Sequence, residues 1–345
     1  MRIVLVSSYV PFIRGGGRFI VEWLETKLRE HGHEVERFYL PFIDSPDVLL
    51  DQVAAFRLMD LSESSDRLIA FRPPSHAMRH PNKILWFIHH IRSFYDLWGT
   101  RYQAVPDTAS GRALRQQLVD LDTRTINEAA KVYTNSKIVA DRLLRFNGVR
   151  ATPLYPPILQ PERFRVDAYG DEIAFVCRIE AHKRQQLMLN AMRYTKSDVR
   201  LSIYGQASSP SYARELSDYV VAHRLSNKVK IENRWISEDE KAEIMAKALA
   251  VAYTPLDEDS YGYPSLEAAH SHKCVVTTTD AGGVLELIED QRNGIVLPPD
   301  PVAIAAGIDR LYQDRALARR MGEANAARLS ELKIDWSHVI QSLTT

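Results

Sequence analysis

The chain begins MRIVLVSSYVPFIRGGGRFIVEWLETKLREHGHEVERFYL, from Met1 to Leu40. Within it, residues 3–6 and 35–40 are short runs rich in branched and aromatic side chains, which are typical of buried strands. Residues 19–30 carry apolar side chains at helical spacing and are followed by Gly32, a residue suited to the end of a helix. A strand, a helix and a strand in this order predict parallel pairing through a right-handed crossover.

The same alternation continues along the chain on both sides of a proline-rich passage at residues 153–171. We predict a linker there, because proline and polar residues interrupt regular structure. The expected architecture is α/β, with two doubly wound Rossmann-like domains around a cleft and ligands at the carboxyl ends of the strands. The expected domains are 1–158 and 171–328, with a last helix in 329–345 packing back on the first domain. Further strands are expected at 68–71, 84–88, 132–134, 173–177, 200–204, 229–231, 249–253 and 274–278.

Length and composition narrow the class of protein. The 345 residues are enough for two domains, since single cores rarely grow past about 250–300 residues. Lys plus Arg and Asp plus Glu both total 44, which argues against an obligate nucleic-acid binder. The two cysteines are too few for a disulfide framework and fit a reducing compartment. The chain shows neither a signal peptide nor an apolar run of the roughly 20 residues that a membrane helix needs, so a cytoplasmic location is expected.

The most informative stretch for function is PLDEDSYGYPSLE, from Pro255 to Glu267. Pro264 suits the first turn of a helix, where its missing N–H costs nothing. Backbone amides at such a turn can hold a phosphate, and Glu267, one turn further on, can accept from hydroxyl groups. A diphosphate beside a diol describes a nucleotide sugar, although an acidic surface loop explains the stretch alone equally well.

Three other motifs follow expected strands in the second half. Arg178 and Lys183 straddle a turn after residues 173–177, where two cations suit a diphosphate. Gly205 ends the next strand and allows a ligand to approach the backbone. The pair Gly282-Gly283 precedes a short helix. Each motif alone is also typical of ordinary turns and surface charge.

Taken together, these motifs resemble the retaining family-4 glycosyltransferases of the GT-B fold, also described as glycosyltransferases group 1. The family's Gly-Arg followed five residues later by Lys is met by Arg178 and Lys183, with Cys177 in place of the glycine. Its pair of acids separated by seven residues is met by Asp259 and Glu267, with aspartate where glutamate is usual. The resemblance covers nearly the whole chain and is most specific over residues 173–296.

The resemblance implies a role for each matching residue of the second domain. Arg178 and Lys183 would neutralise the donor diphosphate, and Glu267 would accept from the ribose hydroxyls. Asp259, whose side chain is one methylene shorter than glutamate, would contact the donor sugar. Further donor contacts are implied for Gly205, Trp235, Ser260, Tyr261, Gly262 and Tyr263.

For the first domain, the resemblance places Gly15 and Gly16 in a loop facing the donor phosphates, and His89 near the donor sugar. A surface histidine pair is the alternative for His89 and His90. Mixed aromatic and polar residues suit sugar rings, which makes the segment after this pair a candidate acceptor pocket. Its members are Arg92, Tyr95 and Asp96.

No cofactor and no metal are expected. The acidic run at residues 257–259 has no neighbouring histidine spacing that supports coordination, and the family resembled here works without a bound divalent cation. The donor itself, linked to UDP or GDP, would be a substrate.

The function predicted from this resemblance is retaining transfer of a hexose from a nucleoside-diphosphate sugar to a hydroxyl of a saccharide or lipid-linked glycan, in polysaccharide or glycoconjugate synthesis. Two alternatives stay open: a nucleotide-sugar epimerase on the same architecture, and a degenerate partner protein that binds the nucleotide sugar without turnover. A nicotinamide dehydrogenase is disfavoured, because the loop after the first strand lacks G-x-G-x-x-G spacing. Residues 1–158 hold 21 basic and 17 acidic residues, so a peripheral contact with the inner membrane face is compatible, with Arg142, Arg145 and Arg150 as candidates.

Overall fold

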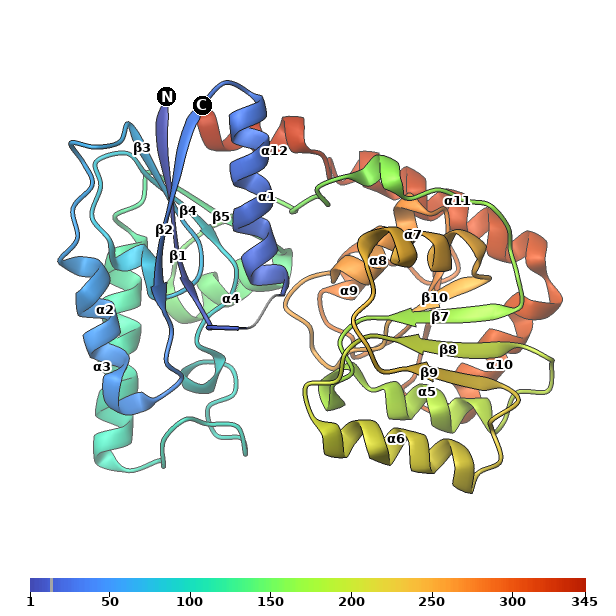
Figure 1. Cartoon of the computed structure of the whole chain (residues 1–345). Helices are drawn as coiled ribbons and strands as arrows, with labels where there is room; N and C mark the ends of the chain where they lie inside the picture. Colours follow the sequence, from blue (N-terminus) through green and yellow to red (C-terminus); the bar gives the residue numbers. More distant parts are fainter. Residues whose placement is uncertain (13–14) are drawn as a thin grey trace. The chain divides into compact units, whose positions relative to one another are not determined.

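The computed structural model describes residues 1–12 and 15–345. The chain divides into two compact units, the first made of residues 1–156 and 335–345 and the second of residues 157–334. Each unit is a six-stranded parallel sheet covered by helices on both faces, which confirms the expected α/β class and the doubly wound architecture (Figure 1). The boundaries differ slightly from the expected 158, 171 and 328.

The sheet of unit 1 has the strand order β2-β1-β3-β4-β5-β6, and all its pairings are parallel. The strand order reverses between β1 and β3, because β2 lies on one side of β1 and all later strands lie on the other. The elements of unit 1 are β1 (Arg2–Tyr9), α1 (Gly16–Glu30), β2 (Glu34–Pro41), α2 (Leu49–Arg57), β3 (Arg67–Ala70), β4 (Lys83–Phe87), α3 (Ala109–Ile126), β5 (Lys131–Thr134), α4 (Lys137–Asn147), β6 (Thr152–Pro153) and α12 (Trp336–Thr344).

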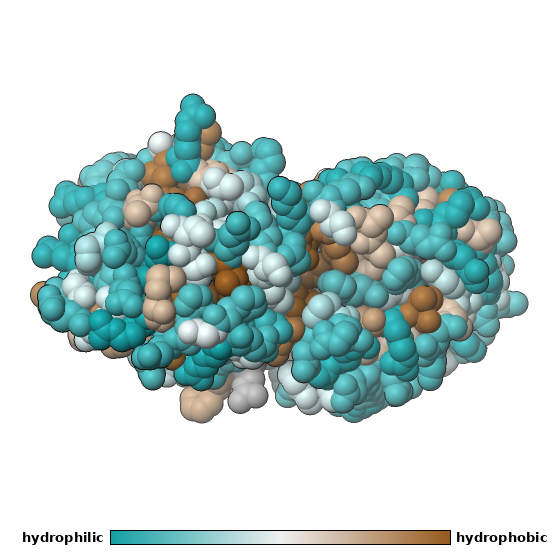
Figure 2. Space-filling view, turned by 90° about the horizontal axis from the view of Figure 1, so that it is seen from above, coloured by the Kyte–Doolittle hydropathy of each residue, from teal (hydrophilic) through white to brown (hydrophobic). Residues whose placement is uncertain are grey.

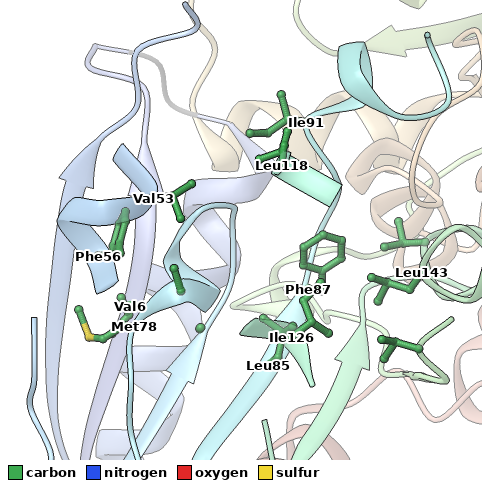
Figure 3. Packing of buried hydrophobic residues seen from close by; sticks show 14 of the residues in the cluster. Val6, Val53, Phe56, Met78, Leu85, Phe87, Ile91, Leu118, Ile126 and Leu143 are labelled. Atoms are coloured by element: carbon green, nitrogen blue, oxygen red, sulfur yellow. The ribbon is translucent and has the colours of Figure 1, made fainter. Parts of the chain in front are cut away.

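Alternating side chains along the strands build two separate cores in unit 1. Ile3 and Leu5 of β1 pack on one face with α1 and α12, whereas Val4 and Val6 pack on the other face with α2, α3 and α4. This is the two-residue period of a strand buried on both faces. The second core is drawn in Figure 3, where Phe87 of β4 lies among aliphatic side chains.

The sheet of unit 2 has the order β12-β11-β10-β7-β8-β9, again wholly parallel. Here the order reverses between β7 and β10. Helices α5, α6 and α10 lie on one face, and α7, α8 and α11 on the other (Figure 1). The elements are β7 (Glu172–Val176), α5 (Gln185–Met192), β8 (Arg200–Tyr204), α6 (Pro210–Ala222), β9 (Val229–Glu232), α7 (Glu238–Lys247), β10 (Ala250–Ala252), α8 (Tyr263–His270), β11 (Val275–Thr278), α9 (Val284–Leu287), β12 (Gly294–Leu297), α10 (Pro301–Gln313) and α11 (Arg315–Glu331).

One of the three arginines predicted to face a membrane does not lie at the surface. Among the described residues, no helix is long and apolar enough to cross a membrane. Hydrophilic residues cover most of the face of each unit seen in Figure 2. Arg142 does not fit the expected membrane contact, because its side chain is largely buried and pairs with Asp96 at 3.4 Å. Arg145 and Arg150 are exposed.

Candidate functional site

The predicted motifs of unit 2 gather where the strand order of its sheet reverses. Residues 177–184 follow β7, and residues 253–262 connect β10 to α8. Because β7 and β10 are parallel neighbours on opposite sides of the reversal, both segments leave the same edge of the sheet. Ligands of open α/β sheets bind at this kind of position. The Leu256 amide donates to the His182 carbonyl at 2.9 Å and ties the two segments together.

Arg178 and Lys183 both lie at this edge, and each is held by a carboxylate of the chain. Arg178 is half-exposed, and its Nη1 lies 2.7 Å from Glu180 Oε1. Lys183 is buried; its Nζ donates to Tyr253 Oη at 2.9 Å and pairs closely with Glu258. The two cations are therefore positioned, and a bound anion would have to share them with these carboxylates.

The thiol of Cys177 lies close to the two cations and to their two carboxylate partners. Burial raises its pKa to about 12, and the nearby charges shift it further in both directions: Lys183 and Arg178 lower it, whereas Glu258 and Glu180 raise it. All four ionic groups thus lie near the half-buried Cys177 side chain. The residue that replaces the family's glycine stays a protonated, neutral neighbour of the cations.

Glu258 is the functional neighbour that sequence reasoning missed. Its carboxylate contacts both Lys183 and Tyr253 Oη, the latter at 3.2 Å. Burial raises its pKa, but the attraction of Lys183 outweighs this and holds the pKa below its ordinary value. The acidic run at 257–259 was the available signal, although it could not show which acid faces the lysine.

The side chain of Arg184 holds neighbouring segments of unit 2 together. Its backbone is left-handed, with φ of 59°, a conformation that glycine adopts more readily than arginine. Its guanidinium pairs with both oxygens of Asp280, at 2.8 and 2.7 Å, and donates to the carbonyls of Thr254 and Pro255 at 2.7 Å. One side chain thereby links the segments that follow β7, β10 and β11.

The double glycine predicted as a turn after β11 supports the loop after β10. Gly282 has a φ of 68°, and a Cβ there would lie 2.5 Å from the Glu258 carbonyl oxygen. The Gly283 amide donates to that same oxygen at 2.8 Å. Only glycine permits this close packing, so Gly282-Gly283 fixes the backbone of the residue that pairs with Lys183.

Gly262 places the start of α8 directly against an aromatic ring. It precedes the helix with a φ of 70°, and a Cβ there would lie 2.2 Å from Tyr253 Cε1. The first turn of α8 has no side-chain cap among the described residues, and the buried hydroxyl of Ser265 has no hydrogen-bond partner among them. Uncapped amides at a helix start can hold an anion.

This packing predicts a large cost for Gly262→Ala. An alanine with a positive φ alone costs about 1–2 kcal/mol. The new methyl group would also collide with Tyr253, so we expect the unfolding free energy to fall by roughly 3 kcal/mol or more in total. Gly148→Ala is the control, since Gly148 has a similar φ of 66° but a Cβ added there would meet nothing within 4 Å. Thermal unfolding of both variants tests the expectation, and equal losses would contradict it.

Glu267 lies in α8, is buried, and faces α7. Its Oε1 accepts from Lys241 Nζ at 2.8 Å, and Lys241 also contacts Glu238 at 2.9 Å. Burial raises the pKa of Glu267, with Lys241 opposing the shift. The sequence carried no signal for Lys241, because contacts between neighbouring helices depend on the tertiary fold.

The other predicted donor contacts lie around the same loop. Asp259 and Ser260 are half-buried, Tyr261 is buried, and Tyr263 begins α8. Their predicted contacts stay predictions. Trp235 precedes α7 with 62% of its surface exposed, as a platform for a flat ring would be.

Gly205 has a different explanation from the predicted one. Its φ is 147°, and a Cβ there would lie 1.9 Å from the Cys177 carbonyl oxygen. The glycine is required because the chain itself packs against it, so the approach of a ligand is not needed to explain it.

In unit 1, the two adjacent histidines have different surroundings. His90 is buried among aromatic rings, its Nε2 lies 2.9 Å from Asn147 Oδ1, and burial lowers its pKa. His89 is half-buried at the end of β4, and its Nε2 lies 3.3 Å from Arg72 Nε. Gly15 and Gly16 lie at the start of α1, after β1.

The predicted acceptor residues differ in their surroundings. Tyr95 is only 2% exposed, and its hydroxyl donates to Asp122 at 2.5 Å, so it belongs to the core. The prediction for Tyr95 is therefore wrong, because the aromatic residues of this segment pack inward. Arg92 pairs with Asp96 at 2.6 Å on the same segment.

Among residues 1–12 and 15–345, no group of three or more His, Cys, Asp or Glu side chains is placed to hold a metal ion.

Comparison with known proteins identifies unit 2. Residues 161–328 match the sequence model of the family described as glycosyl transferases group 1. Unit 2 belongs to this family. Human α-1,3/1,6-mannosyltransferase ALG2 is 33% identical over 98 residues, which are 28% of this chain and 23% of that protein. The α-maltose-1-phosphate synthase of Mycolicibacterium smegmatis is 26% identical over 208 residues, 56% of this chain and 53% of that protein. The chain thus spans about half, or less, of these relatives.

Solved structures show that the fold of the whole chain is GT-B. Sucrose-phosphate synthase from Thermosynechococcus elongatus aligns with a TM-score of 0.74 at 17% identity, covering 99% of this chain and 97% of that chain. HepE of Anabaena aligns with a TM-score of 0.72 at 17% identity, covering both chains fully. The expected GT-B fold is confirmed, and the glycosyl transferase domain is its second unit.

Proposed function

We propose that this protein transfers a sugar, with retention of anomeric configuration, from a nucleoside-diphosphate sugar to a hydroxyl acceptor. The observation that carries the proposal is that Arg178 and Lys183 lie at the same edge of the sheet, where the strand order of the glycosyl transferase domain reverses. Each is held by a carboxylate of the chain, with which a bound diphosphate would share it. Glu267, Tyr263 and Trp235 would complete the donor site.

The chemistry requires positive charge at the leaving group. As the bond between the sugar and the diphosphate breaks, negative charge grows on the phosphate oxygens, and cations already in place stabilise it. Lys183 is pre-oriented by Tyr253 and Glu258, so little reorganisation is needed when the diphosphate arrives. These two cations would supply the charge that a divalent metal supplies elsewhere, and no cofactor is included in the proposal.

Retention is proposed through attack on the face from which the diphosphate leaves. In this scheme the acceptor oxygen bonds to the anomeric carbon, the bond from that carbon to the diphosphate oxygen breaks, and the acceptor proton passes to the departing phosphate oxygen. No side chain forms a covalent bond to the sugar. Asp259 and His89 would contact the donor sugar, and the remaining residues named above bind and stabilise charge.

The relatives favour particular donors for a first test. HepE was solved with UDP and with UDP-glucose, and ALG2 is a mannosyltransferase. UDP- and GDP-linked hexoses are therefore the first donors to examine, with a saccharide or lipid-linked glycan as acceptor.

A ligand panel tests the donor site. UDP, GDP, dTDP and ADP are each added at 1 mM to the full chain, about 100 times a Kd of 10 µM, and thermal unfolding is followed. One of them should stabilise the protein by about 2.7 kcal/mol at that ratio. Trp235→Ala should weaken the response by about tenfold or more, because base stacking contributes about 1–3 kcal/mol. If all four leave the unfolding temperature unchanged, the proposed donor site is wrong.

A further inference from the structure

Arg72, at the strand-order reversal of unit 1, is a cation to which the described residues offer no carboxylate. It follows β3 by two residues, and its side chain is partly buried. Its one hydrogen bond to a described residue runs from Nε to His89 Nε2, at 3.3 Å. Burial lowers its pKa, and no acidic neighbour in the described ranges offsets the effect. A guanidinium in this setting has lost water without gaining a counter-charge.

Three other partly or fully buried cations of unit 1 have a carboxylate partner, whereas Arg67 and Arg115 donate to the backbone carbonyls of Leu343 and Phe94. Arg57 and Lys83 both contact Glu128, at 2.6 and 3.3 Å, and Arg92 contacts Asp96. Arg72 has neither a carboxylate nor a backbone carbonyl as partner among the described residues, and it lies at the edge of the sheet where ligands of doubly wound folds bind. An anionic ligand would supply the counter-charge that Arg57, Lys83 and Arg92 find within the chain.

The side chain of Arg72 lies against the start of α1. A Cβ at Gly17 would lie 3.3 Å from Arg72 Cδ, so the glycine lets the arginine lie against the start of the helix. Arginine Nε can only donate, so His89 Nε2 accepts, and its Nδ1 carries the proton that is donated to the His90 carbonyl at 2.8 Å. His89 therefore fixes the plane of the guanidinium through Nε and leaves the two terminal nitrogens as donors.

We propose that Arg72 binds a phosphate group carried by a substrate, with His89 as its positioning residue. A guanidinium fork matches two phosphate oxygens, and a partly buried one binds them more strongly than an exposed one does. The phosphate belongs either to the donor diphosphate or to a phosphorylated acceptor. The assignment to a substrate rests on the proposed function, whereas binding of phosphate by Arg72 does not.

The test uses inorganic phosphate as the probe on the full chain, followed by 31P line broadening. Wild type should bind it, and Arg72→Gln should bind it at least about tenfold more weakly, as loss of a charge-assisted pair predicts. Arg72→Lys keeps the charge and should retain most of the binding, which separates charge from folding. Arg79→Gln removes an equal charge from an exposed position of unit 1 and should behave as wild type.

Repeating the titration with a saturating nucleoside diphosphate identifies the source. If the nucleotide displaces phosphate and itself binds more weakly to Arg72→Gln, Arg72 holds the donor diphosphate. If phosphate still binds, Arg72 holds an acceptor phosphate. Equal phosphate binding by wild type and Arg72→Gln, or no binding by wild type, would overturn the proposal. Failure of every nucleotide to bind, with Arg72-dependent phosphate binding intact, would instead count against the proposed donor site.

Discussion

Lys183→Ala should lower sugar transfer by about a thousandfold while the donor is still supplied at saturating concentration. In the proposed mechanism this buried ammonium stabilises the charge that grows on the leaving diphosphate, and losing one such group costs about 10²–10³ in turnover. Arg178→Ala should act in the same direction. Its smaller burial and its exposed pairing with Glu180 predict a weaker effect. Release of nucleoside diphosphate from the nucleotide sugar measures both.

A second variant separates lost chemistry from lost stability. Lys183→Ala leaves the partly buried carboxylate of Glu258 without its cation, which destabilises the fold, by less than the cost of about 3–5 kcal/mol for breaking a fully buried pair. Lys183→Ala combined with Glu258→Gln removes both charges and should restore the unfolding temperature without restoring turnover. Lys196→Ala, at an exposed position, is the matched control and should turn over normally. Recovery of activity in the double variant would show that Lys183 acts only in folding.

Glu267→Gln should weaken donor binding by about 10 to 100 times. A carboxylate can accept from both ribose hydroxyls, and a hydrogen bond to a charged group contributes about 1.5–3 kcal/mol. Glu238→Gln is the matched control, because Glu238 shares Lys241 but is more exposed than Glu267. Calorimetric titration with the nucleotide selected by the panel measures the two affinities. Similar losses in both variants would point to Lys241 and remove Glu267 from the donor site.

The pH dependence of the same affinity gives a separate test of Glu267. Its pKa is raised above 4.5, chiefly by burial, so the carboxyl group takes up a proton at a higher pH than an exposed glutamate does. Donor affinity of the wild type should therefore fall as the pH is lowered through this raised pKa, and that of Glu267→Gln should not. Folding stability responds in the opposite sense. The folded chain holds the proton more tightly, so this group contributes to stability at low pH, and the contribution is lost as the pH rises from the unfolded to the folded pKa.

The strands and the GT-B fold could be predicted because their signals are local. Short apolar runs and the strand-helix-strand order determine a parallel sheet, and residues 3–6 and 84–88 indicate strands without knowledge of their partners. The segments omitted were β6 and β12. β6 has two residues, one of them proline, and so carries no strand pattern, whereas β12 contains the branched run Ile-Val-Leu between Gly294 and Pro298 and could have been predicted.

The partners of the site residues could not be predicted, because they depend on which loops meet at the sheet edge. Glu258 and Asp259 are neighbours in sequence, and only the backbone set by Gly282 and Gly283 turns Glu258 toward Lys183. The link from Arg184 to Asp280 crosses 96 positions of the chain, so no local pattern reveals it. Arg72 could not be recognised from a sequence motif. Its distinguishing property is that no carboxylate of the described residues lies beside it, and this depends on the tertiary structure.

The most direct test of the account is a 1H NMR time course of the full chain with UDP-glucose and GDP-mannose in the absence of acceptor. We predict slow release of the nucleoside diphosphate, with the α-anomer of the sugar appearing first and the β-anomer growing only by mutarotation. Lys183→Ala should release neither the nucleoside diphosphate nor the sugar at a measurable rate. First appearance of the β-anomer would contradict retention, and tight nucleotide binding with no release from any donor, with or without a glycan acceptor, would instead establish a binding protein without transferase activity.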